Sequence, residues 1–345
     1  MTDAAASAAP TGGDAIADRV RNALVARAFR IVYQPIVDLA EGVVVAVEAL
    51  SRFTAEPYGP PDVWFADAWQ VGMGAELELA AFEAALADLH HVPAGCRVAV
   101  NLSPPVIAHP DLLGYVAAAG PARVVIELTE HVAVHDYDRV RSAVAILRGR
   151  GAKLAVDDMG AGFASFRHIV KLAPDIIKLD RELVSGIDAD PVRRSVATAM
   201  VNFASDVGSD IVAEGIETRG ELEAVRALGI RYGQGMLLGA PGPVESLSTS
   251  TPFPLPDPRP EPLSDPSPDR QPAALRPRPH PPAGHDHLAA TAEALSRLVE
   301  AAGHGDLSAE PAELATLDQA VAAIARIAAR HGAPEPVAAP GAPWA

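Results

Sequence analysis

The chain has 345 residues, of which 49% are hydrophobic, so it is long enough for one large domain or two ordinary ones. Its net charge of -16 argues against binding to duplex nucleic acid, because phosphate binding over a broad surface needs a basic face. The single cysteine, Cys96, excludes an internal disulfide and a cysteine-rich zinc cluster.

The start of the chain carries no targeting signal that we can identify. Residues 1–15 lack the basic start and apolar middle of a signal peptide, and no apolar stretch reaches the roughly 18 residues of a transmembrane helix. We therefore expect a cytoplasmic protein without a membrane span. Residues 1–12 are rich in alanine and glycine without periodicity, which predicts a disordered lead-in.

Helical and strand-like segments alternate from residue 16 onward. Ile16, Val20 and Leu24 recur at helical spacing, and the turn at Glu41-Gly42 separates two strand-like runs. The predicted elements are a first helix, strands over 31–37 and 43–50, a helix marked by Leu79, Phe82, Leu86 and Leu89, strands over 97–102 and 124–128, a helix marked by Val140, Val144 and Leu147, and strands over 153–157, 176–179 and 211–213. A last unit over 230–238 carries Gln234-Gly235.

Two adjacent carboxylates, Asp157 and Asp158, follow a short apolar run. Gly160 and Gly162 come next, so the strand is expected to end at the carboxylates and to turn there. An anionic pair repels itself unless a cation or a proton lies between the two groups, and a divalent metal would satisfy it. The alternative is that Asp157 caps a helix and Asp158 is solvated.

Glu48 and Arg52 are two further candidates for a functional site. Glu48 lies within an apolar strand, where a bare carboxylate would cost several kcal/mol unless it is paired or metal-bound. Arg52 is the type of residue that holds a phosphate with two parallel hydrogen bonds, although a surface salt bridge would explain it equally well.

Nearly every predicted strand ends in a polar residue. This distribution is typical of an α/β protein of the (β/α)₈ TIM-like barrel class, because the carboxyl ends of the barrel strands and their loops converge on one face. The alternative is a doubly wound open sheet, which would concentrate its polar residues near a switch point.

Seven short motifs stand in one order, and together they resemble the EAL-domain family of cyclic di-GMP phosphodiesterases. The resemblance covers about residues 16–243, and Tyr33-Gln34-Pro35-Ile36 in the first strand agrees with it. The motifs are Glu48-Ala49-Leu50, Asn101-Leu102-Ser103, Glu127-Leu128-Thr129-Glu130, Asp157-Asp158-Met159-Gly160, Lys178-Leu179-Asp180, Glu214-Gly215-Ile216-Glu217 and Gln234-Gly235.

The resemblance implies a modified barrel with an antiparallel first strand, and hydrolysis of cyclic di-GMP to linear pGpG with two Mg²⁺ or Mn²⁺ ions per active site. The metal ligands that it implies are Glu48, Asn101, Glu127, Asp157, Asp158 and Glu214, with Asp157 bridging the two ions. Asp157, Asp158 and Glu214 also count as catalytic residues, together with Lys178 near the attacking water and Gln234 near the reaction centre. Substrate contacts are implied for Gln34, Leu50, Arg52 and Gln234, and Glu130 would hold the loop over 159–166.

The residue chemistry agrees with this resemblance independently, because carboxylate and amide oxygens without cysteine suit Mg²⁺ or Mn²⁺ rather than zinc. The chain departs from the family pattern at three positions. Met159 stands where phenylalanine is usual, Ala161 where threonine is common, and Phe53 where tryptophan is frequent. None of these changes removes an implied metal ligand.

The barrel is expected to span 13–243 and to be followed by segments of a different kind. Proline is dense over 244–285, which predicts an extended linker. Two apolar stripes predict a helical pair over 286–332, followed by a disordered tail over 333–345. The helices could pack on each other, dock on the barrel or bind a partner, and a homodimer through the barrel is a further option that the resemblance raises.

Two other functions compete with the enzyme. One is a catalytically silent receptor that binds cyclic di-GMP and signals through the C-terminal helices. An intact ligand set favours the enzyme over this receptor. The other is an enzyme that acts on a different phosphodiester, which only a panel of substrates would separate.

Overall fold

The computed structural model describes residues 12–129, 132–134, 136–159 and 164–247, and of residues 158, 159 and 164–167 only the backbone. The predicted linker beyond residue 247, the helical pair, the tail, the first eleven residues of the lead-in and Glu130 lie outside the described residues. Two predicted boundaries differ slightly from the structure. Helix α1 begins at Gly12, one residue before the predicted start of the barrel at residue 13. At the other end, a 3-10 turn at Val244–Ser246 lies beyond the predicted end at residue 243, and Val244 is buried in the core.

The strands form a closed barrel in the order β1 to β8, which excludes the open sheet. Strand β1 pairs antiparallel with both β2 and β8, whereas the remaining neighbours pair parallel, as the resemblance implied. The strands are β1 (Phe29–Asp38), β2 (Val43–Phe53), β3 (Arg97–Leu102), β4 (Val124–Leu128), β5 (Lys153–Met159), β6 (Ile176–Leu179), β7 (Asp210–Ala213) and β8 (Tyr232–Gly233).

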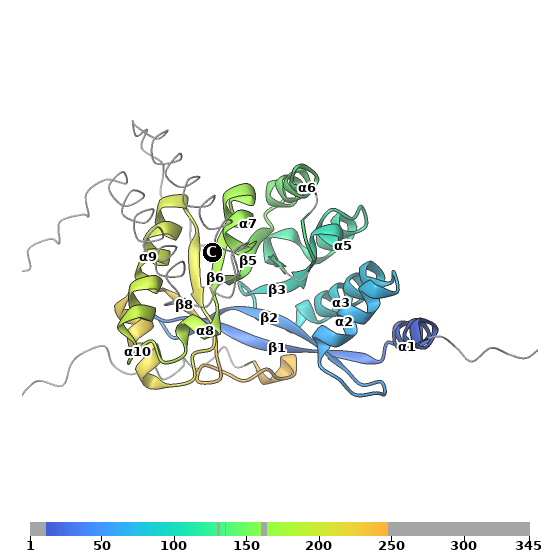
Figure 1. Cartoon of the computed structure of the whole chain (residues 1–345), viewed down its shortest axis with the longest axis horizontal. Coiled ribbons are helices and arrows are strands. Elements are labelled where there is room, and N and C mark those ends of the chain that lie inside the picture. The colour runs from blue at the N-terminus through green and yellow to red at the C-terminus, as the bar shows by residue number, and fades with distance from the viewer. Residues whose placement is uncertain (1–11, 130–131, 135, 160–163, 248–345) are drawn as a thin grey trace, which may run out of the picture.

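Helices lie around the outside of these strands (Figure 1). They are α1 (Gly12–Ala26), α2 (Pro61–Gln70), α3 (Gly74–Ala87), α4 (Pro104–Ile107), α5 (Leu112–Ala119), α6 (Tyr137–Gly149), α7 (Ala164–Leu172), α8 (Arg181–Val184), α9 (Pro191–Val207) and α10 (Arg219–Ala227), with 3-10 turns η1 (Asp88–His90), η2 (Pro121–Arg123) and η3 (Val244–Ser246). None of the helices in the described part of the chain is long and apolar enough to cross a membrane.

The inside of the barrel is filled by one apolar layer to which every strand contributes a residue. Small and branched side chains dominate this layer, so it is packed and not a pore. Its members are Ile36, Ala46, Ala99, Val125, Ala155, Ile176, Val212 and Tyr232, all of them buried. A larger core lies between the barrel and its helices, and it includes Val98, Ile126, Leu154 and Ile177 from the opposite face of the same strands.

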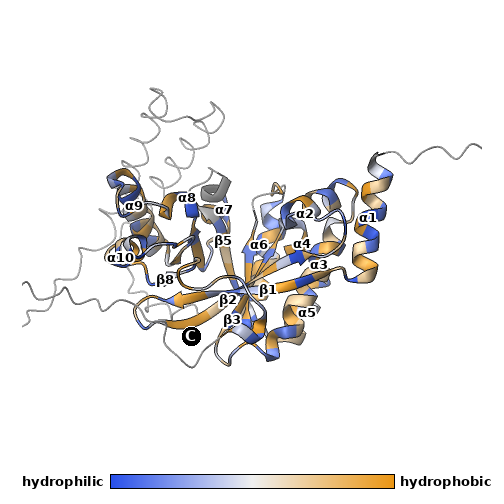
Figure 2. Ribbon diagram, turned by 90° about the horizontal axis from the view of Figure 1, so that it is seen from below, coloured by the Kyte–Doolittle hydropathy of each residue, from blue (hydrophilic) through white to orange (hydrophobic). Residues whose placement is uncertain are grey.

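A separate core joins α1, α2 and α3 to the ends of β1 and β2. Phe53 stacks on Trp64 with ring centroids 4.7 Å apart and an interplanar angle of 7°. The guanidinium of Arg19 covers Trp64 at 4.5 Å, and Val20 of α1 is buried beside them. Helix α1 carries both hydrophobic and hydrophilic residues (Figure 2), and its Val20 and Ala23 are the ones buried in this core. The phenylalanine that departs from the family pattern is therefore packed in the α1–α2 core.

One detail of β5 differs from the sequence prediction. The strand was expected to end at the two aspartates, but it continues to Met159. Its pairing with β6 is irregular between Val156 and Met159. An irregularity of this kind inserts an extra residue into one strand and bends the strand locally.

Candidate functional site

The polar residues of the site form the layer directly above the apolar layer of the barrel. Successive side chains of a strand point to opposite faces, so a residue two positions along points inward again. Asp157 lies two residues after Ala155, and Lys178 lies two residues after Ile176. Glu48, Asn101, Glu127, Glu214 and Gln234 keep the same spacing from Ala46, Ala99, Val125, Val212 and Tyr232. Gln34 precedes Ile36 by two residues instead, because β1 runs in the opposite direction.

Lys178 lies at the centre of the polar layer. Its Nζ is 2.7 Å from Glu214 Oε1 and 3.0 Å from Glu127 Oε2. It is also 3.4 Å from Glu48 Oε2 and 3.4 Å from Asp157 Oδ1. Only 1% of the lysine side chain is exposed, whereas the side chains of Asp157 and Glu214 are 15% and 16% exposed. One buried ammonium therefore faces four carboxylates, and the cluster has an excess of negative charge.

The pKa directions in this cluster follow from that excess. Burial raises the pKa of the Glu127 carboxyl well above its usual value, and repulsion from Glu48 and Asp157 adds to it, although Lys178 opposes both. Burial likewise raises the pKa of Glu214. For Lys178, burial would lower the pKa, but the four carboxylates raise it well above the usual lysine value. When all of these groups are ionised, the cluster therefore carries more negative than positive charge.

Glu48 is held by hydrogen bonds from several sides. Asn101 Nδ2 donates to Glu48 Oε1 at 2.8 Å, and Gln234 Nε2 donates to Glu48 Oε2 at 2.6 Å. Burial would raise the pKa of Glu48, but Lys178 and these amide donors outweigh it and lower the pKa. Gln234 Nε2 also donates to Gln34 Oε1 at 3.0 Å. Gln234, which directly follows β8, therefore links Gln34 of β1 to Glu48 of β2.

These residues fit a divalent cation. Oxygen atoms of Glu48, Glu127 and Asp157 can be chosen that all lie within 4.8 Å of one another. Asn101 uses its Nδ2 in the bond to Glu48, so its Oδ1, the amide atom that binds metal ions, is not engaged in that bond. Hard oxygen donors and an excess of negative charge are the environment that Mg²⁺, Mn²⁺ and Ca²⁺ prefer.

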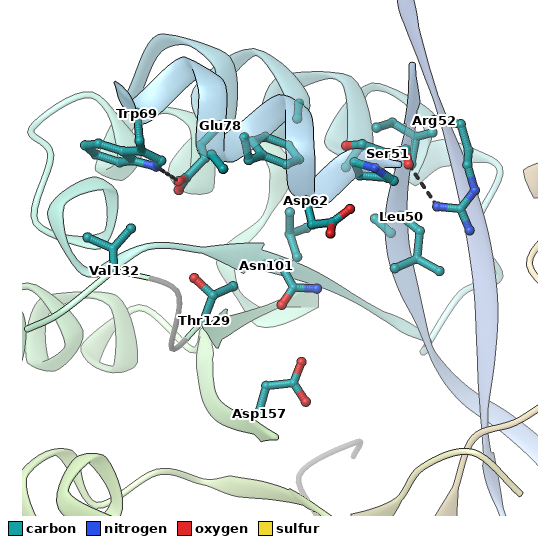
Figure 3. Close-up of a pocket in the computed structure, with 18 residues that line it drawn as sticks. Leu50, Ser51, Arg52, Asp62, Trp69, Glu78, Asn101, Thr129, Val132 and Asp157 are labelled. Atoms are coloured by element: carbon teal, nitrogen blue, oxygen red, sulfur yellow. Dashed lines mark hydrogen bonds between the residues drawn. The ribbon is translucent and has the colours of Figure 1, made fainter. Parts of the chain in front are cut away.

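A cavity of about 530 Å³ opens beside the metal-ligand candidates. Asn101 and Asp157 belong to its wall, so the cavity and the acidic cluster are continuous (Figure 3). The cavity extends between β2 and the helices α2 and α3. The rest of its lining is mainly apolar and includes Leu50, Phe65 and Trp69, with Arg52, Asp62 and Glu78 as ionisable members. A planar apolar group bearing a phosphate would match such a lining.

The far end of this cavity contains a buried carboxylate. Glu78 of α3 accepts a hydrogen bond of 2.7 Å from Trp69 Nε1 and one of 2.8 Å from the backbone N–H of Ser103. Figure 3 shows the first of these bonds on the wall opposite Asp157. Burial raises the pKa of Glu78, and the hydrogen bonds only partly offset this effect.

The structure brings together most of the residues singled out in the sequence. Glu48, Asn101, Glu127, Asp157, Lys178, Glu214, Gln34 and Gln234 form one connected cluster. Leu50 and Arg52 lie on the cavity wall outside this cluster, and Arg52 Nη1 donates to the carbonyl of Ser51 at 2.8 Å. Asp158 lies in β5, but its side chain and the whole of Glu130 are outside the described residues.

Sequence reasoning missed Glu78 and Trp69. The predicted stripe of Leu79, Phe82 and Leu86 marks the helix correctly, but Leu77, Glu78, Ala81 and Ala85 are the residues buried with Phe82. A glutamate placed one turn before Ala81 and Phe82 was the available signal, since a carboxylate within an apolar stripe needs hydrogen-bond partners.

The family model of the EAL domain matches residues 17–241. A probable cyclic di-GMP phosphodiesterase, PdeB of Escherichia coli, is 32% identical over 241 residues, which are 66% of this chain and 45% of PdeB. The bifunctional diguanylate cyclase/cyclic di-GMP phosphodiesterase MucR of Pseudomonas aeruginosa is 30% identical over 243 residues, which are 67% of this chain and 36% of MucR. The matched part of this chain thus spans less than half of each relative.

A solved structure agrees with these relatives. Klebsiella pneumoniae BlrP1 has been determined as a calcium and cyclic di-GMP complex and as a manganese and cyclic di-GMP complex. It is 33% identical to this chain with a TM-score of 0.56, and the alignment covers 62% of this chain and 56% of BlrP1.

Proposed function

The chain belongs to the EAL domain family, and from this premise we propose that it hydrolyses cyclic di-GMP to linear pGpG with two Mg²⁺ or Mn²⁺ ions. The proposal places this reaction in the cytoplasm as part of bacterial signalling. The observation that carries it is the cluster around Lys178, in which Glu48, Glu127, Asp157 and Glu214 converge with Asn101 at the carboxyl ends of the parallel strands.

The metal ligands that we assign are Glu48, Asn101, Glu127 and Asp157 for one ion, and Asp157, Asp158 and Glu214 for the other. Two divalent cations, when bound, would lower the pKa of the attacking water and neutralise the charge that develops on the phosphate. The protein supplies rigidity, because Glu48 is already fixed by Asn101 and Gln234 before any ligand arrives. Preorganised ligands need no rearrangement at the moment of reaction.

Lys178 has a positioning and electrostatic role in this proposal. Its Nζ donates to Glu127 at 3.0 Å and approaches Glu214 at 2.7 Å, so it orders carboxylates that would otherwise repel one another. The same ammonium presents a donor and a positive charge toward the place where the water and the phosphate would meet. We assign Gln234 to the same region because its amide already reaches Glu48 and Gln34.

The cavity beside the cluster would receive the rest of the dinucleotide. Arg52 lies on its wall and can hold a phosphate through its guanidinium, while Leu50 and Phe65 offer apolar contact to a base. Contacts of this kind hold substrate and transition state alike, so they contribute mainly to affinity.

A direct assay tests the proposal. The full chain is incubated with cyclic di-GMP and Mn²⁺, and pGpG is measured over time, with linear and 2′,3′-cyclic phosphodiesters as competing substrates. We expect cyclic di-GMP to be hydrolysed to pGpG and the other phosphodiesters to remain intact. Tight binding of cyclic di-GMP without turnover in either Mg²⁺ or Mn²⁺ would favour the receptor, and faster hydrolysis of another phosphodiester would change the substrate assignment.

A further inference from the structure

Glu78 joins two parts of the site that come from different elements. Its Oε1 accepts a hydrogen bond from Trp69 of α2, and its Oε2 accepts one from the backbone of Ser103. Trp69 lies on the wall of the cavity, and Ser103 directly follows β3. One side chain of α3 therefore connects the cavity wall to the end of the strand that carries Asn101.

Two residues of α3, Gly74 and Glu78, fix the position of the Trp69 ring. The ring lies against Gly74, where an added Cβ would be 2.3 Å from Trp69 Cδ2, so a larger residue would displace the ring. Glu78 comes one helical turn later and takes the indole N–H at 2.7 Å. Gly74 thus makes room for the ring, and Glu78 sets its rotation.

The other hydrogen bond acts close to the proposed metal ligands. Ser103 is two residues after Asn101, and Asn101 Nδ2 donates to Glu48 at 2.8 Å. The bond from Ser103 N–H to Glu78 holds the backbone at the point where β3 ends and α4 begins. A shift of this backbone would move Asn101 relative to Glu48, because Ser103 and Asn101 are joined by a short peptide segment.

Packing alone does not account for a carboxylate at this place. Glu78 is 7% exposed, and the groups that act on its ionisation are burial and hydrogen bonds from Ser103 and Trp69, with no cation among the described residues. An apolar side chain of similar size would fill the space without the cost of burying a charge. What the carboxylate adds is two directed acceptors that fix two neighbours at once.

We propose that Glu78 is a positioning residue of this site, which couples the Trp69 wall of the cavity to the backbone that places Asn101. This inference rests on the proposed function, since it assumes that the cavity receives the dinucleotide and that Asn101 binds a metal ion. Groups that orient metal ligands typically change metal affinity or activity by about 10- to 100-fold when they are removed.

Three substitutions in the full chain test the coupling. Glu78→Gln keeps the size but turns an N–H group toward one of the two donors. Trp69→Phe keeps an aromatic ring on the cavity wall but removes the indole N–H donor together with part of the ring that lies against Gly74. Glu76→Gln is the matched control, because Glu76 lies on the same helix and is exposed.

Each variant is measured for Mn²⁺ affinity by calorimetry without nucleotide, for kcat and KM with cyclic di-GMP, and for melting temperature. We expect Glu78→Gln to weaken Mn²⁺ binding and to raise KM, each by about tenfold. Trp69→Phe should raise KM by about threefold, since loss of one hydrogen bond is a modest change, and should leave Mn²⁺ affinity unchanged. Glu76→Gln should match the wild type in all three measurements.

The outcomes separate this inference from the proposed function. If the wild type forms pGpG and Glu78→Gln lowers only the melting temperature, Glu78 is structural and the inference is wrong. If the wild type forms no pGpG, the proposed function fails, and the Mn²⁺ titration still tests the effect of Glu78 on the acidic cluster. If Glu78→Gln does not fold, Trp69→Phe decides, and an unchanged KM in that variant contradicts the coupling.

Discussion

Lys178 Nζ lies 2.7 Å from Glu214 Oε1, and this pair joins β6 to the residue that directly follows the neighbouring strand β7, at the centre of the acidic cluster. The lysine is buried, so its charge acts on the carboxylates with little screening by water. It is the principal positive charge that this cluster holds without metal.

Lys178→Met should leave the carboxylates mutually repelled and destabilise the metal-free protein. We expect a lower melting temperature without metal, and a larger rise on adding Mn²⁺ than in the wild type, because the cation then removes more repulsion. Turnover should fall by at least about 100-fold if the ammonium serves the reaction. Thermal denaturation with and without Mn²⁺ measures the first effect. Lys171→Met, an exposed position of α7, is the control and should behave as wild type.

Asp157→Asn tests the residue to which we assign a bridging role. The amide keeps the size but removes a negative charge that both ions would share, so hydrolysis should fall by at least about 10³-fold. Cyclic di-GMP affinity should change less, because Arg52 and the apolar part of the cavity lining are unchanged. Turnover and calorimetric titration are measured side by side, with the exposed Asp138→Asn as control. Equal losses of turnover and affinity would argue against the bridging role.

Metal removal should abolish the activity reversibly. After excess chelator, we expect no pGpG until Mg²⁺ or Mn²⁺ is restored. Ca²⁺ should bind without supporting the reaction, since its longer bonds and higher coordination number would spread the two-metal geometry. The rate is followed against metal concentration for each ion. Full activity in excess chelator would contradict the assignment of the acidic cluster.

The end of the barrel can be located by truncation. A chain that ends after Leu247 keeps η3 and should keep the melting temperature and activity of the full chain. A chain that ends at Pro243 loses the burial of Val244, worth about 1.5 kcal/mol, and should melt lower by about 3–6 °C. The melting temperatures of the two truncated chains, measured beside that of the full chain, check this prediction. A large loss of stability in the longer of these two truncated chains would mean that residues beyond 247 belong to the barrel core.

Glu78 should make stability depend on pH. Burial raises its pKa above the ordinary value of 4.5, so the folded protein keeps this proton at pH values where the unfolded chain has lost it. The contribution of this proton to the free energy of unfolding is complete below pH 4.5 and is lost as the pH rises through the pKa that Glu78 has in the folded protein. Urea denaturation from about pH 4 to 8 should therefore show a smaller decline in Glu78→Gln than in the wild type, whereas Glu76→Gln should retain the wild-type decline. Parallel curves for all three proteins would contradict this.

Much of the fold and most of the candidate cluster could be predicted from the sequence. Strands over Arg97–Leu102 and Val124–Leu128 were predicted with the bounds that the structure has, because runs of branched residues buried on both faces have few alternatives. The order of polar residues at strand ends pointed to a barrel, which the structure confirms. The closing contact of β8 with the antiparallel β1 was implied by the family resemblance and not by any local pattern.

The sequence by itself determined which residues share the inward face of the barrel, since strand periodicity places Asp157 above Ala155 and Lys178 above Ile176. Only the tertiary structure decided how these residues pair. Contacts such as Gln234 with Gln34, or Glu78 with Ser103, join positions far apart in the chain and depend on how strands close and helices pack. Local propensity carries no information about such distances, so Trp69 and Glu78 became functional candidates only once α2, α3 and β3 lay together in three dimensions.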